Sequence, residues 1–392
     1  MAVNTFTGAT NSNWGTVDNW SLGTVPTAND GHTTTFDAAS PACTVNTSAR
    51  VCNHIDFTNY VNTITMTFTI TVSGSIIFGL GMTVDGTAGI IQKAVNTITS
   101  NGFSWTNDFT FSGSGSRTLL DNLTILGQTI ISNDSGNVTI NDFNIYCYGN
   151  LTVNQNSTNN RTVLGTTNIH LVGGSDATWT SVGTLKNNLT INKSGGVLTL
   201  GANVDYNTGV LTYTAGTVDT TTNDSILYIK LATTLNTDNI SWNKIFIIGG
   251  AATYNITLNS LLTADIIYLN YYSVSFIGTN VWTCNTFILI GNISAGDFMS
   301  LKAGSTYTIN TQFRVYSSSV YSFLIKSGTP ASVAYLVFNG GSNQKLINCD
   351  ATDIDSSGGD QIWTLDGLLS NTTNWGVSDS SIPPVIIATS CS

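Results

Sequence analysis

Aspartates gather near the carboxyl-terminal end of the chain, at Asp350, Asp353, Asp355, Asp360 and Asp366. In an extended strand Asp353 and Asp355 would point to the same side. A pair of carboxylates on one surface is the acid and base arrangement of glycoside hydrolysis. A polysaccharide hydrolase or lyase is therefore one candidate function, although we expect these aspartates to be solvated turn residues and assign no catalytic residue.

The same segment has an oxygen-rich spacing that is typical of a calcium loop. Asp353, Asp355 and Ser357 alternate before Gly358, as ligands do in the first half of such a loop. The twelfth position is Thr364, where a calcium loop has a bidentate glutamate. We expect no cofactor, with Ca²⁺ held by these three residues as the alternative.

Exposed aromatic rings could stack on sugars without any charge. Trp179, Trp242, Tyr271 and Tyr272 are the candidates for a carbohydrate-binding groove, together with Tyr316 and Tyr321. Asparagine amides beside them would supply hydrogen bonds to hydroxyl groups. The alternative is that these rings pack in the core.

A run of threonines predicts a strand and a second kind of binding surface. From Thr63 to Val72, threonine alternates with apolar residues, which is the pattern of a half-buried strand. A flat array of threonines is also typical of ice-binding proteins. Such a protein repeats the array on every coil, whereas the pattern is strong in this segment only.

The composition favours short strands over helices. Only 9% of residues are charged, and the 22 acidic residues are all aspartate. Glutamate, lysine and arginine normally fill the solvent face of a helix. Threonine suits strands, and the 37 glycines suit turns.

A degenerate repeat predicts stacked coils. The form Asn-apolar-Thr-apolar begins at Asn122, Asn137, Asn150, Asn188 and Asn255. Asn122 and Asn188 are 66 residues apart, which fits three coils of about 22 residues, while Asn137 and Asn150 lie off this grid. We predict an all-β chain, a right-handed parallel β-helix with irregular coils and asparagine ladders between turns. A β-sandwich is the main alternative.

The ends differ from the middle and divide the chain into four regions. We expect an N-terminal cap or attachment region over 1–60, β-helix repeats over 61–345, a C-terminal cap over 346–377 and an extended tail over 378–392. The first region is rich in tryptophan and the tail contains two adjacent prolines. Irregular caps cover the open ends of a solenoid.

The net charge of the chain limits the partners it can bind, and the N-terminal sequence indicates where it is synthesised. The net charge is −10 and the pI about 4.4, which argues against nucleic acid and anionic membranes. We find no signal peptide and no long apolar span in the sequence, so we expect synthesis in a cytosol and no membrane insertion. The six cysteines have no metal-site spacing and are expected to be buried, with pairing of Cys43 and Cys52 left open.

Two terminal motifs resemble those of phage and bacterial β-helical surface proteins. The first runs from Trp14 through Asn19-Trp20-Ser21 to Gly23, Pro26 and Asp30, and the second joins Cys349-Asp350 to Asn374-Trp375-Gly376. The resemblance covers about 70 residues. It implies a structural virion protein, a fibre, spike or capsid-surface appendage, on a virion or extracellular surface.

The resemblance also implies partners and alternatives. The partners are further copies of the chain in a homotrimer, other virion proteins and a host-surface glycan. A polysaccharide-depolymerising tailspike is the enzymatic alternative, but the Gly-His-Gly and Arg-x-Lys motifs of β-helical polygalacturonases are absent from the sequence. A glycan-binding adhesin or an ice-binding protein is the alternative among binding proteins.

Overall fold

The computed structural model describes residues 2–93, 96–133, 137–155, 162–248, 253–270, 273–290, 297–317 and 321–378. These residues form short β-strands and one 3-10 turn, η1 (Val17–Asn19), with no α-helix among them. The strands stack in parallel on successive coils as a right-handed parallel β-helix. The predicted fold class is confirmed.

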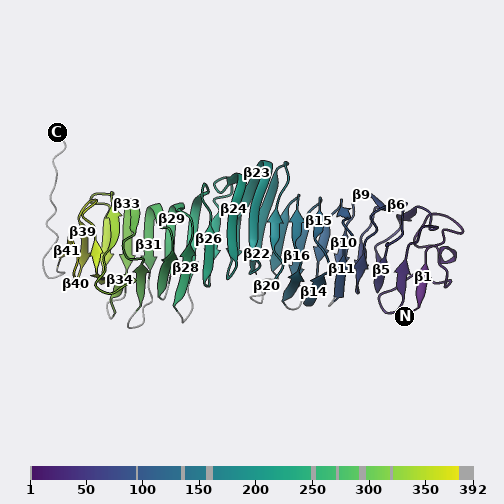
Figure 1. Cartoon of the computed structure of the whole chain (residues 1–392), viewed down its shortest axis with the longest axis horizontal. Coiled ribbons are helices and arrows are strands. Elements are labelled where there is room, and N and C mark those ends of the chain that lie inside the picture. The colour runs from purple at the N-terminus through teal and green to yellow at the C-terminus, as the bar shows by residue number, and fades with distance from the viewer. Residues whose placement is uncertain are drawn as a thin grey trace. The chain divides into compact units, whose positions relative to one another are not determined.

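The chain divides into two compact units, Met1–Ser225 and Ile226–Ser392. Figure 1 shows the strands of the first unit one after another along the coils. Their parallel pairing begins at the first strand and divides them into three series, one for each face of the coils. One face contains β1 (Val3–Thr5), β2 (Thr33–Thr35), β5 (His54–Asp56), β8 (Ile76–Ile77), β11 (Asn96–Thr99), β14 (Gly115–Leu119), β17 (Val138–Asp142) and β20 (Thr162–Leu164). The second contains β4 (Arg50–Cys52), β7 (Ile70–Val72), β10 (Ile90–Gln92), β13 (Phe109–Phe111), β16 (Thr129–Asn133) and β19 (Leu151–Gln155).

The third face of this unit is built in two stretches. Near the start it is a separate sheet of β3 (Cys43–Val45), β6 (Thr63–Met66) and β9 (Thr83–Gly86). Further along it contains β12 (Ser104–Trp105), β15 (Leu123–Ile125), β18 (Ile145–Cys147) and β21 (Ile169–Leu171). Three longer strands then continue the faces, β22 (Ala177–Leu185), β23 (Leu189–Tyr206) and β24 (Val210–Asp219).

The second unit also has three faces. One contains β25 (Ile226–Ile229), β27 (Ser241–Ile248), β29 (Leu262–Asn270), β31 (Trp282–Ile290), β33 (Thr306–Tyr316), β36 (Gln344–Ile347), β39 (Ile362–Leu365) and β41 (Trp375–Ser378). Another contains β26 (Thr233–Asn236), β28 (Tyr254–Leu258), β30 (Val274–Gly278), β32 (Phe298–Leu301), β34 (Phe323–Ser327), β37 (Cys349–Thr352) and β40 (Leu369–Ser370). The early parts of the long strands form the third face with β35 (Ala334–Phe338) and β38 (Ile354–Asp355).

Many strands have only two or three residues, so one or two of their side chains point outward. In β15 the apolar Leu123 and Ile125 are buried and Thr124 between them is partly exposed. Side chains alternate across a strand, so a three-residue strand contributes two groups to the core and one to the surface. The β-branched and aromatic residues of the sequence therefore fill a continuous interior.

An asparagine ladder runs along one corner of the first unit. The backbone N–H of Asn144 donates to Asn122 Oδ1 at 3.1 Å. Asn168 Nδ2 donates to Asn144 Oδ1 at 3.1 Å, and Asn188 Nδ2 donates to Asn168 Oδ1 at 3.0 Å. The predicted ladder and the three coils between Asn122 and Asn188 are confirmed. Asn137 lies off the grid because it precedes a strand on another face.

The threonine run does not form the single strand that the alternation predicts. β6 ends at Met66 and β7 begins at Ile70, on a different sheet. The chain turns between them, and Phe68 is 41% exposed. The prediction is wrong because the alternating pattern continues through a corner that contains neither glycine nor proline.

Aromatic rings pack densely at the start of the first unit. Trp14 and Trp20 have ring centroids 5.1 Å apart, and Phe6 lies 5.2 Å from Trp20. Phe36 contacts these rings and stacks on Phe57 at 4.9 Å. This cluster covers the apolar interior at the first coils. The division into caps and repeats stays a prediction, and the predicted tail lies, apart from Ser378, outside the described residues.

Candidate functional site

The two tryptophans predicted to line a sugar-binding groove are core residues. Trp179 is 0% exposed and Trp242 is 1% exposed. Trp179 packs against Tyr206, with centroids 6.2 Å apart. A sugar cannot stack on a ring that the protein covers on both sides, so the prediction is wrong for these two residues. Tyr271 and Tyr272 lie outside the described residues.

The carboxyl-terminal aspartates accept hydrogen bonds from neighbouring coils. Asp350 Oδ1 accepts the N–H of Leu368 at 2.7 Å. Asp353 is 8% exposed, has a left-handed φ of 57° and accepts from Ala331 N at 2.9 Å and Asn371 Nδ2 at 2.6 Å. These bonds satisfy backbone and side-chain donors at the turns.

The hydrogen bonds of these aspartates also weaken the alternative that Asp353, Asp355 and Ser357 hold Ca²⁺. Both oxygens of Asp353 are engaged by protein donors, and Asp355 Oδ1 accepts from Ser357 N at 2.8 Å within its own turn. Within the described residues, no group of three or more histidine, cysteine or aspartate side chains is placed to hold a metal. We derive no metal chemistry from this segment.

The threonines of the predicted ice-binding array are divided between two sheets. Thr63 and Thr65 lie on β6, and Thr71 lies on β7. On the next coil Thr63 pairs with Thr83, but Thr65 pairs with Asp85. No flat face of threonine pairs results from this run.

Five cysteines are buried small residues of the core. Cys43, Cys52, Cys147, Cys284 and Cys349 are buried and unpaired within the described residues. Burial raises the pKa of the Cys52 thiol to about 12. A protonated, covered thiol is a poor nucleophile and a poor metal ligand. The prediction of buried cysteines is confirmed for these five.

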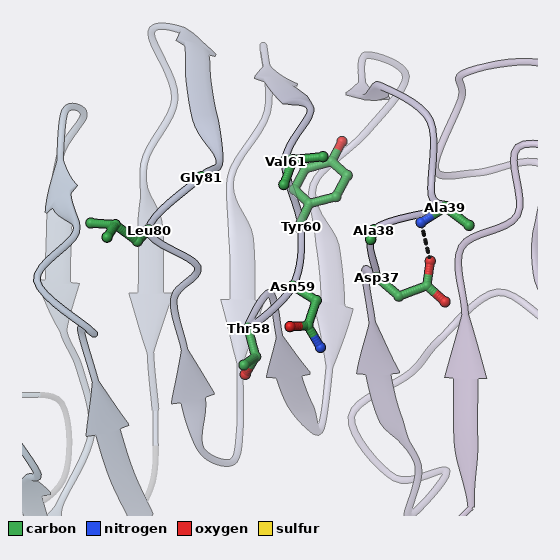
Figure 2. A pocket seen from close by; sticks show the side chains of 9 residues that line it. All are labelled: Asp37, Ala38, Ala39, Thr58, Asn59, Tyr60, Val61, Leu80 and Gly81. Carbon is green, nitrogen blue, oxygen red and sulfur yellow. Dashed lines mark hydrogen bonds between the residues drawn. The ribbon is translucent and has the colours of Figure 1, made fainter.

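A depression of about 610 Å³ lies over the early turns of the first unit. Figure 2 shows Asp37, Tyr60 and Leu80 around it. Asp37 Oδ1 accepts the N–H groups of Ala39 and Ser40, each at 2.9 Å. Tyr60 Oη lies within hydrogen-bond distance of the carbonyls of Pro41 and Thr63. The Asp37 carboxylate and the Tyr60 hydroxyl are thus engaged by backbone groups of the protein.

The most distinctive surface is an outward row of side chains on the second unit. We call it the aromatic–cationic face: it lies on β25, β27, β29, β31, β33 and β36, and its central row is Tyr228, Phe246, Tyr268, Ile288, Arg314 and Lys345. Strand register sets each member beside the next on the following coil. Figure 1 shows β29, β31 and β33 side by side in this unit. The first five are half-buried and Lys345 is exposed.

The aromatic part of this row is pre-arranged by ring contacts. Phe246 and Tyr268 stack with centroids 4.7 Å apart and an interplanar angle of 28°. Tyr228 meets Phe246 edge to face at 5.5 Å. Such contacts hold rings in one orientation and lower the entropy lost on binding. The three residues are half-buried, so part of each side chain remains accessible to solvent.

Cations accompany the rings. The Lys230 ammonium lies 5.8 Å from the Tyr228 ring, and the Lys345 ammonium lies 5.6 Å from the Tyr316 ring. Arg314 Nη1 donates to Tyr316 Oη at 3.3 Å. Tyr316, one of the predicted sugar-stacking residues, is half-buried at the end of β33 beside these cations. Tyr321, another of them, is 43% exposed.

The sequence contains a pattern that indicates this row, but the apolar residues on both sides of each aromatic residue make it hard to recognise. Each aromatic residue is the middle of an apolar triplet, Leu227-Tyr228-Ile229, Ile245-Phe246-Ile247 and Ile267-Tyr268-Leu269. The flanking residues are buried, so the middle one must point outward. The spacings of 18 and 22 residues match single coils.

Neither similarity to known proteins nor a membrane-spanning helix indicates a function for this chain. No protein-family model, curated protein or solved structure matches this chain. Among the described residues there is no helix long and apolar enough to cross a membrane.

Proposed function

We propose that this chain is a structural attachment protein, a β-helical module of a virion fibre, spike or appendage that binds a host-surface glycan. The observation that carries the proposal is the row of contacting rings of Tyr228, Phe246 and Tyr268, which are half-buried on one face of the second unit. Aromatic faces bind the apolar sides of sugar rings, and the polar edges of the site fix orientation.

The fold supports a mechanical role. Within each unit, the described coils are hydrogen-bonded to their neighbours through parallel strands, and a corner of the first unit carries an asparagine ladder. Such a scaffold keeps the spacing of surface groups constant from coil to coil. Rigid display is suited to binding a repeating polymer, because little ordering is needed on contact.

The virion assignment rests on the terminal motifs around Trp14, Trp20 and Trp375. Self-association as a homotrimer and docking on other virion proteins belong to the same proposal. A depolymerising enzyme is less favoured, because Asp350 and Asp353 accept structural hydrogen bonds. No observation favours ice binding after the threonine run divides between two sheets.

A glycan array with the purified full chain tests the proposal. We expect retention of wild type on a subset of glycans. Tyr268→Ala should bind about tenfold more weakly, because a half-buried ring of the row is lost. Tyr268→Phe keeps the ring and should keep binding. Tyr335→Ala is the matched control, because Tyr335 is 40% exposed on the third face of the same unit.

Two results would contradict this proposal. One is no glycan binding by a folded wild-type chain. The other is equal loss of binding in the Tyr268→Ala and Tyr335→Ala variants, which would make the effect independent of the face. An assay of new reducing ends on the bound glycans would detect cleavage and would support the enzymatic alternative instead.

A further inference from the structure

Exposed apolar side chains border the third face of the first unit on both sides. The first ridge lies at the corner between the first face, which contains β5, β8, β14 and β17, and the third face; its members are Val61, Leu80, Leu120 and Phe143. The second ridge lies at the corner between the third and second faces; its members are Phe68, Leu126 and Tyr148. These side chains are 41–71% exposed. Apolar groups gathered in this way indicate a contact surface.

The two ridges lie level with each other. Three coils carry one member of each ridge, before and after a strand of the third face: Val61 and Phe68 around β6, Leu120 and Leu126 around β15, and Phe143 and Tyr148 around β18. The backbone N–H of Leu120 donates to Ile98 O at 2.9 Å. The backbone N–H of Leu126 donates to Trp105 O at 2.7 Å. Both bonds run to the same preceding coil, that of β11 and β12, so the two leucines lie at the same height.

The third face between the ridges is mostly neutral. β12, β15 and β18 present Ser104, Thr124 and Tyr146 outward. Among all residues of β6, β9, β12, β15 and β18, the single carboxylate is that of Asp85 on β9, which is exposed. An apolar margin around a neutral polar surface suits contact with a protein, since little charge must be desolvated.

The equal heights of the ridges indicate a contact between copies of this chain. Copies related by rotation about an axis parallel to the coil stack have each coil level with the same coil of the next copy. The first ridge of one copy is then level with the second ridge of its neighbour at β6, β15 and β18. A copy in the reverse direction would match at most two of these levels, because β6 lies three coils before β15 and β18 only one coil after it.

The charges beside the ridges favour contact between unlike ridges. Asp121 follows Leu120 and Asp142 precedes Phe143, so carboxylates adjoin the first ridge. Both chain neighbours of each member of the second ridge are uncharged. Packing two first ridges together would bring like charges close, which is unfavourable. Packing the first ridge on the second avoids this repulsion.

The position of Asp85 favours three copies over two. Two parallel copies packed face to face would place the Asp85 carboxylate of each opposite that of the other, because a two-fold axis along the coils relates identical residues at the same height. Like charges in that position destabilise a contact. Three copies in contact only through their ridges leave space between the third faces, and the carboxylates stay hydrated.

We propose that three copies of the chain associate in parallel around the third face of the first unit, with the first ridge of each copy packed on the second ridge of the next. Such a contact uses two different patches and closes after three copies. This inference rests on the self-association that is part of the proposed function and identifies its surface. The aromatic–cationic face belongs to the second unit and takes no part in it.

Sedimentation equilibrium of the purified full chain, from about 1 to about 100 µM, tests the proposal. We expect wild type to reach a mass three times the 41.5 kDa of one chain. Leu120→Lys and Leu126→Asp should each weaken association by about tenfold or more, because a charge enters an apolar contact. The double variant with both changes should recover about threefold or more, because opposite charges then meet between copies.

A matched control carries the same two changes away from the ridges. Val51 on β4 is 39% exposed and Val182 on β22 is 58% exposed. Val51→Lys with Val182→Asp therefore introduces the same charges at exposed apolar positions of the same unit and should associate as wild type does. Circular dichroism checks that each variant is folded.

Each outcome decides one statement. A wild type that stays monomeric, or stops at two copies, would overturn the three-fold contact. Equal losses in the ridge and control variants would contradict the ridges as its surface. Single variants that weaken association without recovery in the double variant would contradict the pairing of unlike ridges. Glycan binding is measured separately on the array: trimers that bind no glycan would overturn attachment alone, and a glycan-binding monomer would overturn this inference alone.

Discussion

Replacing Trp282 by alanine is expected to lower the free energy of unfolding of the second unit by about 3–5 kcal/mol. The side chain is 0% exposed. Its ring stacks on Phe287 at 5.1 Å, packs against Tyr307 at 5.2 Å and contacts Phe276 at 5.9 Å. Truncation would leave a cavity among three aromatic rings, which the hydrogen-bonded strands around it hold open.

The indole N–H of Trp282 provides an internal check. Within the described residues Trp282 Nε1 is buried without a hydrogen-bond partner. Trp282→Phe keeps ring stacking and removes the unsatisfied donor, so its loss should be far smaller than that of Trp282→Ala. Denaturant unfolding followed by circular dichroism and tryptophan fluorescence measures both.

The matched control is a tryptophan at the surface of the same unit. Trp363 is 46% exposed, so Trp363→Ala should cost less than about 1 kcal/mol. A loss for Trp282→Ala no larger than that for Trp363→Ala would contradict the packing described here.

Replacing Gly278 by alanine is expected to cost about 3 kcal/mol or more. Gly278 has a φ of 104°, which side chains rarely adopt, and an added Cβ would lie 2.4 Å from the Leu258 carbonyl oxygen. Leu258 is its register partner on the coil below. Because the obstacle is backbone, it cannot move aside without breaking the parallel ladder.

Gly304 is a control that distinguishes the backbone strain of a positive φ from the steric clash of an added Cβ atom. It has a φ of 71°, but an added Cβ meets no atom within 4 Å. Gly304→Ala should therefore cost only about 1–2 kcal/mol from the left-handed backbone. Comparable losses for the two variants in thermal or denaturant unfolding would show that close stacking of the coils at Gly278 is not what requires glycine. Gly86 faces Met66 in the same manner in the first unit.

The fold could be predicted because it depends on composition and local pattern. Absence of glutamate removes helix surfaces, and the Asn-apolar-Thr-apolar form repeats on the scale of a coil. Asn122 and Asn188 carry the ladder because a turn residue must satisfy its amide on the next coil. The corner after Met66 could not be predicted, since Thr67-Phe68 continues the alternation across it.

The candidate face was harder to predict than the fold. The residue type of Trp179 or Trp242 does not indicate burial, because tryptophan serves cores and binding surfaces alike. Tyr228, Phe246 and Tyr268 lie in the middle of apolar triplets, where the sequence shows no alternation of polar and apolar residues although the burial alternates. Their alignment depends on coils of unequal length, which only the strand register determines.

Hydroxyl-radical footprinting with and without the glycan polymer that binds most tightly on the array tests most directly whether the aromatic–cationic face is the contact surface. We predict that bound polymer protects Tyr228, Tyr268 and Trp363 from oxidation. Trp363 belongs to this set because the next residue, Thr364, pairs with Leu346, which places Trp363 beside Lys345 of the row. Oxidation of the exposed Tyr335, on another face of the same unit, should be unchanged. Protection of Tyr335 with no change at Tyr228 and Tyr268, under conditions where the polymer is bound, would contradict the account.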